Sequence, residues 1–285
     1  MGTLFLVATP IGNMEDITLR ALRVLREASL IAAEDTRSAR ILLKHHGIEA
    51  RTTSYNEHNA KSKTPHIIAA LDQGDVAVVS DAGMPAISDP GHDLVLAAIN
   101  AGHQVVPIPG ASAVIAAVAA SGLPSRRFHY LGFLPRQSGP RKRALIEASS
   151  SGDTLVVYES PHRVRATLSD VLAALGDRQI AVCRELTKLY EEIWRGAVSD
   201  AIEHFAAPRG EFTLVIEGTS KDDQRAVVAT DTVESVVAEL RQSDVLAKVA
   251  VAEIVRRCGV PKRTAYTAWH REAWQGDERT ASEAL

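Results

Sequence analysis

Short β-branched or aliphatic runs alternate with longer amphipathic segments along most of this chain, and this alternation limits the folds open to it. Apolar residues at helical spacing between short apolar runs are typical of strand–helix–strand units. The first half predicts a largely parallel sheet covered by helices. Strands are predicted at residues 4–8, 30–33, 76–80 and 104–108, and helices at 17–28 (with Asp16 as N-cap), 66–71, 94–101 and 113–121.

A second series of the same kind follows, and a different pattern ends the chain. Strands are predicted at 128–133, 154–158, 180–184 and 212–217, and helices at 143–149, 161–175 (capped by Ser160, with Pro161 first) and 198–205. After a polar segment, helices are predicted at 233–242, 247–258 and 262–270, with a helix-turn-helix-like joint at Gly259-Val260-Pro261. The predicted organisation is an N-terminal α/β domain (1–121), a C-terminal α/β domain (122–220), and a linker with a helical tail (221–285).

Composition excludes several classes of protein. With 46% hydrophobic residues and a net charge of only −3, disorder is not expected. The chain has no apolar run of the ~18 residues that a membrane span needs, and its start lacks a basic signal-peptide region. Cys183 and Cys258 form no CxxC, and the histidines at 45, 46 and 58 have no carboxylates at ligand spacing. We expect a cytoplasmic protein with no metal and no membrane partner.

One local charge asymmetry stands out. Residues 126–146 contain six basic residues and no acidic one, with Phe128, Tyr130 and Phe133 among them. Such a stretch can bind a polyanion, or it can be a solvated loop. The charge pattern by itself leaves both interpretations open.

Three glycine-bearing loops follow predicted strands of the first domain, at residues 8–13, 80–91 and 107–113. The first has neither the spacing of a dinucleotide-binding loop nor the lysine of a Walker loop. Each loop alone can be a plain turn or a site of close helix packing. Because carboxyl ends of parallel strands meet at one sheet edge, the three together predict a ligand pocket. Asp81 can accept a hydrogen bond from an amine or a ribose hydroxyl, whereas Asp89 before Pro90 fits a turn.

Polar clusters at residues 34–37, 158–163 and 184–192 follow predicted strands, and residues 55–59 form a further compact polar run. The segments 6–21, 80–91 and 109–113 resemble the tetrapyrrole methylase superfamily of S-adenosylmethionine-dependent enzymes. More narrowly, the loops at 9–13 and 80–91 together with these four polar segments resemble its RsmI branch. That branch methylates the ribose 2′-hydroxyl of a decoding-site cytidine in 16S small-subunit ribosomal RNA. Six motifs occur in the same order between residues 3 and 218. The first loop has fewer glycines than the superfamily pattern, and Ser80-Asp81-Ala82 replaces Gly-Asp-Pro; both departures are usual for the RNA-directed branch.

The resemblance implies a tetrapyrrole-methylase-like fold, a homodimer, and S-adenosylmethionine held in the cleft between two α/β domains, with S-adenosylhomocysteine as product. It also implies the residues that contact the cofactor. These are Pro10, Ile11, Asp81, Ala82, Gly83, Met84, Ser112 and Ala113 from the first domain, and Tyr158, Glu159 and the segment 184–187 from the second.

Methyl transfer to a hydroxyl benefits from a nearby base, or from a cation that stabilises a developing alkoxide. The candidates are Glu159, Glu185 and Lys188, although Glu185 and Lys188 can also simply pair with each other or with Arg184. Phe133 or Tyr55 can stack an extruded base, although Phe133 ends an apolar strand and fits a core position better. The residues expected to bind RNA are Arg37, His58, Arg136, Arg141, Lys142, Arg143, His162 and Arg163.

Two alternatives remain. One is a methylase of the same fold that acts on a tetrapyrrole-like small molecule or a protein, against which the polar clusters and the basic stretch argue. The other is a non-enzymatic RNA-binding protein that uses the helical tail. Residues 221–285 hold ten basic and eleven acidic residues, so the tail as a whole is a weak polyanion binder by charge. We expect it to pack on the body or to assist docking. The substrate is either free RNA or an assembled small ribosomal subunit.

Overall fold

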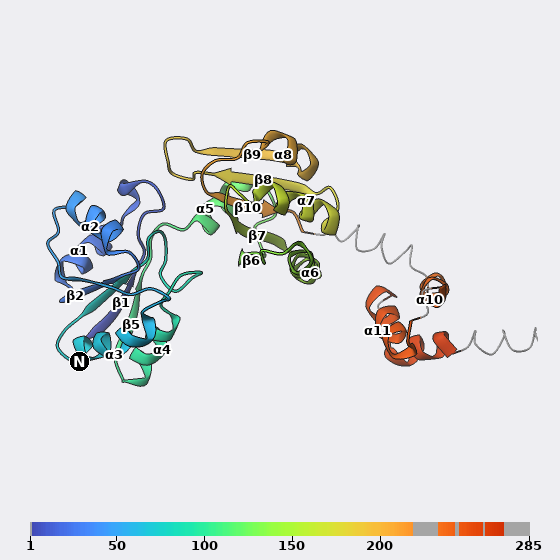
Figure 1. Ribbon diagram of the computed structural model, residues 1–285, viewed down its shortest axis with the longest axis horizontal. Coiled ribbons are helices and arrows are strands. Elements are labelled where there is room, and N and C mark those ends of the chain that lie inside the picture. Colours follow the sequence, from blue (N-terminus) through green and yellow to red (C-terminus); the bar gives the residue numbers. More distant parts are fainter. Residues whose placement is uncertain (1, 219–232, 243–244, 259, 271–285) are drawn as a thin grey trace, which may run out of the picture. The chain divides into compact units, whose positions relative to one another are not determined.

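The computed structural model describes residues 2–218, 233–242, 245–258 and 260–270 (Figure 1). The chain divides into two compact units, residues 1–218 and 219–285. The first unit contains two five-stranded sheets, and the described part of the second unit is helical. Within the described residues, no helix has the length and apolar character required to cross a membrane.

The first sheet is wholly parallel, with the strand order β3-β2-β4-β1-β5. Helices α1 and α2 bury their apolar sides on one face, and α3 and α4 cover the other. This is the predicted arrangement of a parallel sheet between two helical layers. The strands are β1 (Thr3–Val7), β2 (Leu30–Ala33), β3 (Thr52–Ser54), β4 (Val76–Val79) and β5 (Gln104–Ile108), and the helices are α1 (Leu19–Glu27), α2 (Thr36–His45), α3 (Ala60–Leu71) and α4 (His92–Asn100).

Several local details of the first half differ from the prediction. Asp16 does not cap α1, because residues Met14–Asp16 form a separate 3₁₀ turn (η1) and Thr18 accepts the hydrogen bond from the backbone N–H of Ala21, at 3.1 Å. Helix α2 and strand β3 were not predicted. Helix α3 begins at Ala60 rather than residue 66, since its first turns are polar and contain Pro65, so no apolar period marks them.

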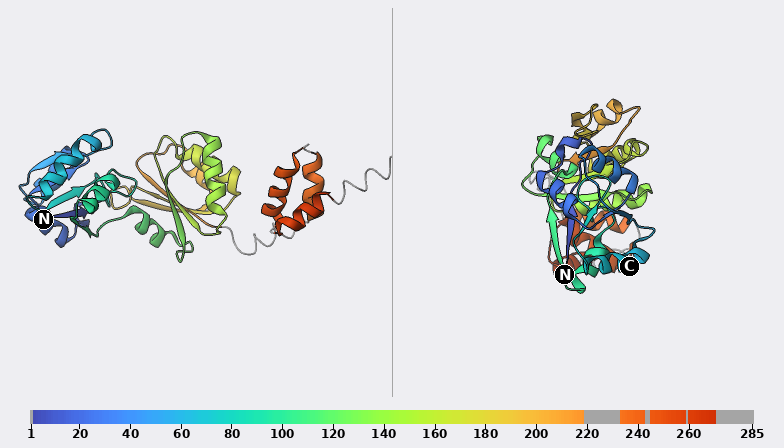
Figure 2. Two further views of the ribbon diagram at one scale, coloured as in Figure 1. Left: turned by 90° about the horizontal axis from the view of Figure 1, so that it is seen from below. Right: turned by 90° about the vertical axis from the view of Figure 1, so that its left-hand side faces the viewer.

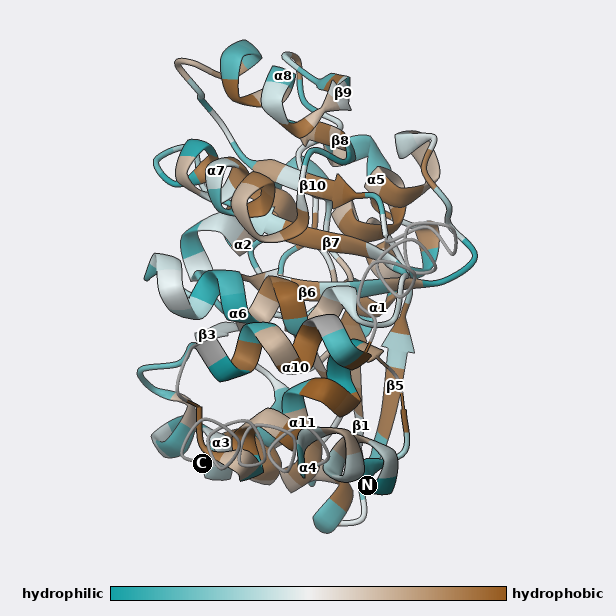
Figure 3. Cartoon of the chain, turned by 90° about the vertical axis from the view of Figure 1, so that its right-hand side faces the viewer, coloured by the Kyte–Doolittle hydropathy of each residue, from teal (hydrophilic) through white to brown (hydrophobic). Residues whose placement is uncertain are grey.

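The second sheet mixes directions, with the order β6-β7-β10-β8-β9. Strand β6 is parallel to β7, and β10 runs antiparallel between β7 and β8. Strands β7 and β10 are almost wholly hydrophobic (Figure 3) because both faces are covered, by α6, α7 and α8 on one side and α5 on the other. The elements are α5 (Ala113–Ser121), β6 (Phe128–Phe133), α6 (Ser138–Ser149), β7 (Thr154–Glu159), α7 (Val164–Leu175), β8 (Gln179–Arg184), β9 (Glu192–Ala197), α8 (Val198–His204) and β10 (Phe212–Ile216).

Three features of this half also correct the prediction. Strand β9 was missed within the polar segment after β8. Ser160 and Pro161 do not start α7; they lie in a turn in which the Ser160 carbonyl accepts from the N–H groups of Arg163 and Val164. Helix α5, assigned by sequence to the first domain, packs Val114, Ala117 and Val118 on the second sheet.

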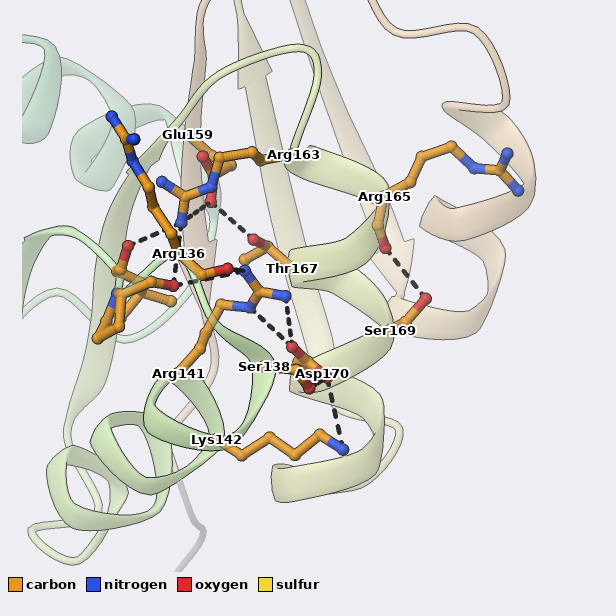
Figure 4. A network of polar contacts seen from close by, with 12 residues as sticks. Arg136, Ser138, Arg141, Lys142, Glu159, Arg163, Arg165, Thr167, Ser169 and Asp170 are labelled. Carbon is orange, nitrogen blue, oxygen red and sulfur yellow. Dashed lines mark hydrogen bonds and ion pairs between the residues drawn. The ribbon is translucent and has the colours of Figure 1, made fainter.

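A buried ion pair joins α6 to α7 (Figure 4). Arg141 contacts a single carboxylate oxygen of Asp170, with its Nη2 at 2.6 Å and its Nε at 2.7 Å, and the two side chains are only 5% and 10% exposed. Ser138 donates a hydrogen bond to the other Asp170 oxygen at 2.8 Å. The guanidinium also donates to the Arg136 carbonyl at 3.1 Å. Part of the basic stretch therefore stabilises the fold, and the expectation that Arg141 contacts RNA is wrong for this geometry.

The described part of the second unit contains α10 (Val233–Gln242), α11 (Ala247–Cys258) and a helix over residues 262–270 (Figure 2). They share one small core that includes Val236, Leu240, Val251, Ile254 and Ala265. The three predicted tail helices are confirmed. The predicted linker at 219–232 and the residue Gly259 lie outside the described residues.

The Arg141–Asp170 pair generates a prediction about stability. Removing one partner of a buried pair leaves an uncompensated charge, so Arg141→Met should lower the free energy of unfolding by about 3 kcal/mol. The measurement is urea unfolding at pH 7. Arg143→Met, at an exposed position of the same helix, is the matched control and should change stability by less than about 0.5 kcal/mol. Equal effects of the two changes would refute a stabilising role for the pair.

The same pair predicts a pH dependence. Burial raises the pKa of Asp170, but hydrogen bonds from Ser138 and Arg141 outweigh it, so the net pKa lies below the usual value. The stabilisation is therefore fully present above the unfolded-state pKa of about 3.9 and is lost as the pH falls further. Acidification from pH 5 to pH 3 should destabilise the Arg141→Met variant less than the parent.

Candidate functional site

A cavity of about 430 Å³ lies where the strand ends of the two sheets face each other. Parallel strands bring their carboxyl ends to one edge, which is where α/β sheets bind ligands. From the first sheet, the cavity is lined by residues that follow β1, β2, β4 and β5. From the second sheet, it is lined by residues at the ends of β6, β7 and β8 and at the start of β10, because β10 runs in the opposite direction. A volume of this size suits a small-molecule ligand.

The loop between β4 and α4 forms one wall and is held at both ends. Gly83 and Thr9 exchange backbone hydrogen bonds at 2.9 and 3.1 Å, and Gly83 has a φ of 78°, which favours glycine. Ala86 and Ser88 also have positive φ, at 69° and 60°. Strain of this kind persists where surrounding contacts enforce it. Here the Ser88 hydroxyl bonds the Tyr130 hydroxyl of β6 at 2.7 Å, which ties this loop to the second sheet.

Carboxylates dominate the polar lining. Among the described residues that line the cavity, none is Lys, Arg or His, whereas five are acidic: Glu34, Asp81, Asp89, Glu159 and Glu211. Burial raises the pKa of Glu34. A hydrogen bond from the Asp81 N–H lowers this pKa, and the negative charges of Asp89 and Asp81 raise it further. Burial likewise raises the pKa of Asp89. The cavity therefore favours a ligand that carries positive charge and disfavours a polyphosphate.

Aromatic side chains form the opposite wall. The rings of Tyr130 and Phe133 lie 5.2 and 5.7 Å from the ring of Tyr158. Burial raises the pKa of Tyr158, so its hydroxyl stays protonated at neutral pH. Phe133 is 59% exposed and lines the cavity, which corrects the expectation of a core position. Tyr55 is instead buried, at 2% exposure, and is not placed to stack a base.

The structure brings together nearly all the residues that the family resemblance implied. Of those named individually, all but Pro10 line the cavity, and of the segment 184–187 only Leu186 does. The lining residues that the resemblance did not name are Glu34, Ile87, Ser88, Asp89, Val114, Phe133, Ser160, Pro161, Cys183, Glu211, Phe212 and Thr213. Three of them, Ile87, Ser88 and Asp89, belong to the loop 80–91 that was predicted to form a pocket, and Phe133 was a candidate for base stacking. Glu34 had a signal, because it directly follows a strand. Residues 211–213 had none, since their position depends on the reversed direction of β10.

Glu159 is not placed to act as a base. Its side chain is fully buried and accepts hydrogen bonds from the Ser160 N–H at 2.8 Å and the Thr167 hydroxyl at 2.6 Å. Arg163 lies 3.4 Å from the same carboxylate and donates to the Leu134 carbonyl at 2.7 Å (Figure 4). The buried position of Glu159 corrects the expectation of catalysis by this residue, whereas RNA contact by the partly exposed Arg163 stays a prediction. The two side chains hold the segment that follows Phe133.

Glu185 and Lys188 lie beside the cavity and contact each other. The Lys188 ammonium is 2.9 Å from Glu185 and 2.7 Å from Glu211, which lines the cavity. Burial lowers the pKa of Lys188, but hydrogen bonds to Glu211 and Glu185 outweigh it and the net pKa is raised. Burial raises the pKa of Glu185, yet its bonds to Lys188 and to the Glu211 N–H lower it overall. Lys188 is therefore a persistent cation at this position and not a base.

The remaining RNA candidates are at the surface. Arg37, His58, Arg136, Arg143 and His162 are exposed, and Lys142 is partly exposed. Arg37 pairs with Asp35 at 2.6 Å, and Lys142 lies 3.5 Å from Asp170. In the part of the chain that the structure describes, no cluster of three or more His, Cys, Asp or Glu side chains could hold a metal ion.

Comparison with solved structures identifies the fold. Diphthine synthase superposes with a TM-score of 0.62 at 15% identity, over 77% of this chain and 91% of its own. The methyltransferase CobJ gives 0.59 at 21% identity, over 78% and 96%. Uroporphyrin-III-C-methyltransferase from Thermus thermophilus gives 0.52 at 22% identity, over 75% and 94%. At these identities the likeness concerns the fold alone, and it confirms the expected fold class.

Sequence comparison identifies the family. The family model of the tetrapyrrole (corrin/porphyrin) methylases matches residues 3–202. The protein named ribosomal RNA small subunit methyltransferase I of Halalkalibacterium halodurans is 47% identical over 95% of this chain and 96% of its own length. Its namesake in Synechocystis sp. is 42% identical over 93% and 96%. The chain therefore belongs to the tetrapyrrole methylase family, in the branch that contains the proteins named ribosomal RNA small subunit methyltransferase I.

Proposed function

We propose that this chain transfers the methyl group of S-adenosylmethionine to the ribose 2′-hydroxyl of a cytidine in the decoding region of 16S small-subunit ribosomal RNA. The observation that carries the proposal is the acid-lined cavity in a chain that matches its ribosomal RNA methyltransferase relatives from end to end. The proposal includes a cytoplasmic homodimer, which rests on the family resemblance.

The cavity fits the proposed cofactor. S-adenosylmethionine carries a sulfonium and an amine, and the carboxylates of Glu34, Asp81 and Asp89 supply the complementary charge. Alanine and glycine at 82 and 83 let a ligand approach the backbone closely. Tyr158 adds an aromatic surface with a protonated hydroxyl. No basic side chain among the described lining residues opposes a cation.

When bound, the cofactor supplies an electrophilic methyl group, which the 2′-oxygen attacks in line as the carbon–sulfur bond breaks. The protein's first contribution is to hold oxygen, carbon and sulfur aligned. Its second is to stabilise the negative charge that develops on the oxygen as the hydroxyl proton passes to solvent water. Lys188 is the candidate for this role, because it stays protonated and lies beside Glu211 at the cavity.

The RNA would meet the rim of the cavity. Phosphate contacts can be made by exposed side chains with N–H donors, namely Arg136, Arg143 and His162, and also Arg37 and His58. Phe133 presents its exposed ring at the cavity, where it can stack an extruded base. A small-molecule or protein methylase is the alternative, since a shared fold does not decide the substrate.

The central prediction concerns the reaction itself. Purified protein with labelled S-adenosylmethionine should label small ribosomal subunits, or their RNA, that lack the modification. Nuclease mapping should place the label on one ribose 2′-oxygen of a decoding-region cytidine. Labelling at another nucleotide would refute the proposed target. Cofactor binding without any transfer to subunits or naked RNA would favour the small-molecule or protein-methylating alternative.

A second prediction tests Lys188. Loss of a group that stabilises transition-state charge typically lowers kcat about 10²–10³-fold, so Lys188→Ala should do so while the Kd for S-adenosylmethionine stays within about twofold. Lys188→Arg keeps the charge and should retain more activity. Lys44→Ala, an exposed lysine of α2, is the control. A Lys188→Ala variant with parental kcat would remove this residue from the mechanism.

A third prediction tests the acidic lining with calorimetric titration. Glu34→Gln should weaken binding of S-adenosylmethionine about tenfold, and should weaken S-adenosylhomocysteine less, because the product lacks the sulfonium charge. Because the pKa of Glu34 is raised, its carboxylate takes up a proton at a higher pH than the usual glutamate pKa of about 4.3 as the solution is acidified. Cofactor binding by the parent should therefore weaken from pH 7 toward pH 5, more steeply than in the variant. Equal losses for cofactor and product would contradict a charge interaction.

A further inference from the structure

The helix at residues 262–270 has one buried side and one exposed side. Ala265 is fully buried in the small core of the second unit, and Ala268 and Trp269 pack against that core. At 100° per residue, Arg263, Tyr266, Thr267 and His270 fall on the side away from that core, and Lys262 lies at the edge of this side, next to Trp269; all of these except Trp269 are exposed. We call the five exposed residues the basic face. The rings of Tyr266 and His270 lie 4.4 Å apart on it.

Charge is distributed unevenly in this unit. Residues 245–270 contain five Lys or Arg and one acidic residue, whereas the segments 219–232 and 271–285 together contain seven acidic residues. The balance of ten basic and eleven acidic residues over 221–285 therefore conceals a basic helical portion. An average over the whole segment underestimates how well its described part can bind a polyanion.

The three arginines of α10 and α11 make hydrogen bonds or ion pairs inside the unit. Among the described residues, the two basic side chains Lys262 and Arg263 of the basic face form no ion pair. Arg241 donates to the Trp269 carbonyl at 2.5 Å and lies over its ring. Arg257 pairs with Glu239 at 2.8 Å, and Arg256 pairs with Glu253. Within the described residues, no acidic group lies within ion-pair distance of Lys262 or Arg263, and residues 261–270 include no Asp or Glu.

The share of this chain that aligns differs between the relatives named for ribosomal RNA and the other related proteins. The relatives named ribosomal RNA small subunit methyltransferase I align over 93–95% of this chain. The three solved structures align over only 75–78% of this chain, although the alignment covers 91–96% of their own length. The family model ends at residue 202. The helical unit is therefore an addition to the methylase fold that accompanies the ribosomal RNA relatives.

We propose that the second unit is an RNA-docking module, which binds the phosphodiester backbone of the substrate ribosomal RNA through the basic face. This rests on the proposed function and adds to it. Lys262 and Arg263 contact phosphates, which positions the RNA without reading its sequence. The Tyr266–His270 pair offers aromatic surface to a sugar or an unstacked base. By sequence, the segment 259–261 before this helix resembles a helix-turn-helix joint, a motif whose second helix contacts nucleic acid through its N-terminal residues.

The test uses full-length protein and small ribosomal subunits that lack the modification. Lys262→Glu, Arg263→Glu and the double variant are compared with Lys248→Glu, an exposed lysine of α11 outside the basic face. Affinity for subunits is measured at several KCl concentrations, together with methyl-transfer kinetics and the Kd for S-adenosylmethionine. Thermal unfolding verifies that each variant is folded, and Lys262→Gln with Arg263→Gln replaces any that is not.

Each lost phosphate contact should reduce the slope of log affinity against log salt by about 0.7–0.9. The double variant should therefore lose roughly 1.5 from the slope and bind subunits at least about tenfold more weakly near 0.1 M KCl. Its KM for subunits should rise, while kcat at saturating subunits and the cofactor Kd stay parental. Lys248→Glu should change the slope by less than half as much.

The outcomes separate the docking module from the proposed function. A double variant with parental affinity and slope would overturn the docking proposal, even if the parent methylates RNA. An equal loss in Lys248→Glu would overturn the assignment to the basic face. If the parent binds subunits but transfers no methyl group, the proposed function fails, and the binding comparison still decides whether the basic face docks RNA.

Discussion

The parallel register of the first sheet is the constraint on which the rest of the structure depends. Because β1, β2, β4 and β5 all run the same way, the segments that follow them must emerge at one edge. The second sheet meets that edge with the ends of β7 and β8 and the start of β10. A cavity results whose two walls differ in character, with three of the five carboxylates from the first sheet, and the aromatic rings and the other two carboxylates from the second.

Burial, more than residue type, decides what each charged side chain does here. Three side chains have the chemistry expected of binding and catalytic residues: Arg141, Arg163 and Glu159. Their hydrogen bonds go instead to Asp170, to the Leu134 carbonyl and to Thr167, respectively, within the second half of the first unit. A buried charge is tolerated only with partners of this kind. These partners hold the turn after Phe133 in place, so the network supports the cavity wall, to which Glu159 itself belongs.

The methylase fold is shared by proteins that are named for different substrates. Proteins named for tetrapyrrole, diphthine and ribosomal RNA chemistry share the fold of residues 1–218, so the fold by itself does not select a substrate. Among the described residues, the exposed arginines of the first unit and the basic face of the helical unit are features that suit a polyanion.

The sequence by itself determined the elements whose signals are local. Strands Leu30–Ala33 and Gln104–Ile108 and helices Ala113–Ser121 and Ala247–Cys258 have the predicted bounds, because apolar period and turn residues act over a few positions. The family resemblance located nearly half of the cavity lining, since Asp81–Met84, Ser112 and Tyr158 belong to recognisable motifs. The sequence pattern did not predict β9, whose hydrophobic signal is weak. It also predicted the wrong N-cap for α1, because Asp16 and Thr18 are both suitable capping residues.

Only the tertiary structure decided which residues meet across the chain. That Glu211 lies beside Lys188, that Phe133 is exposed at the cavity, and that Asp170 lies against Arg141 all depend on the order and direction of strands far apart in sequence. The packing of α5 on the second sheet depends on the same long-range order. Such contacts form when whole layers close on each other, and the energy that selects them is the burial of shared surfaces, which no local window of sequence contains.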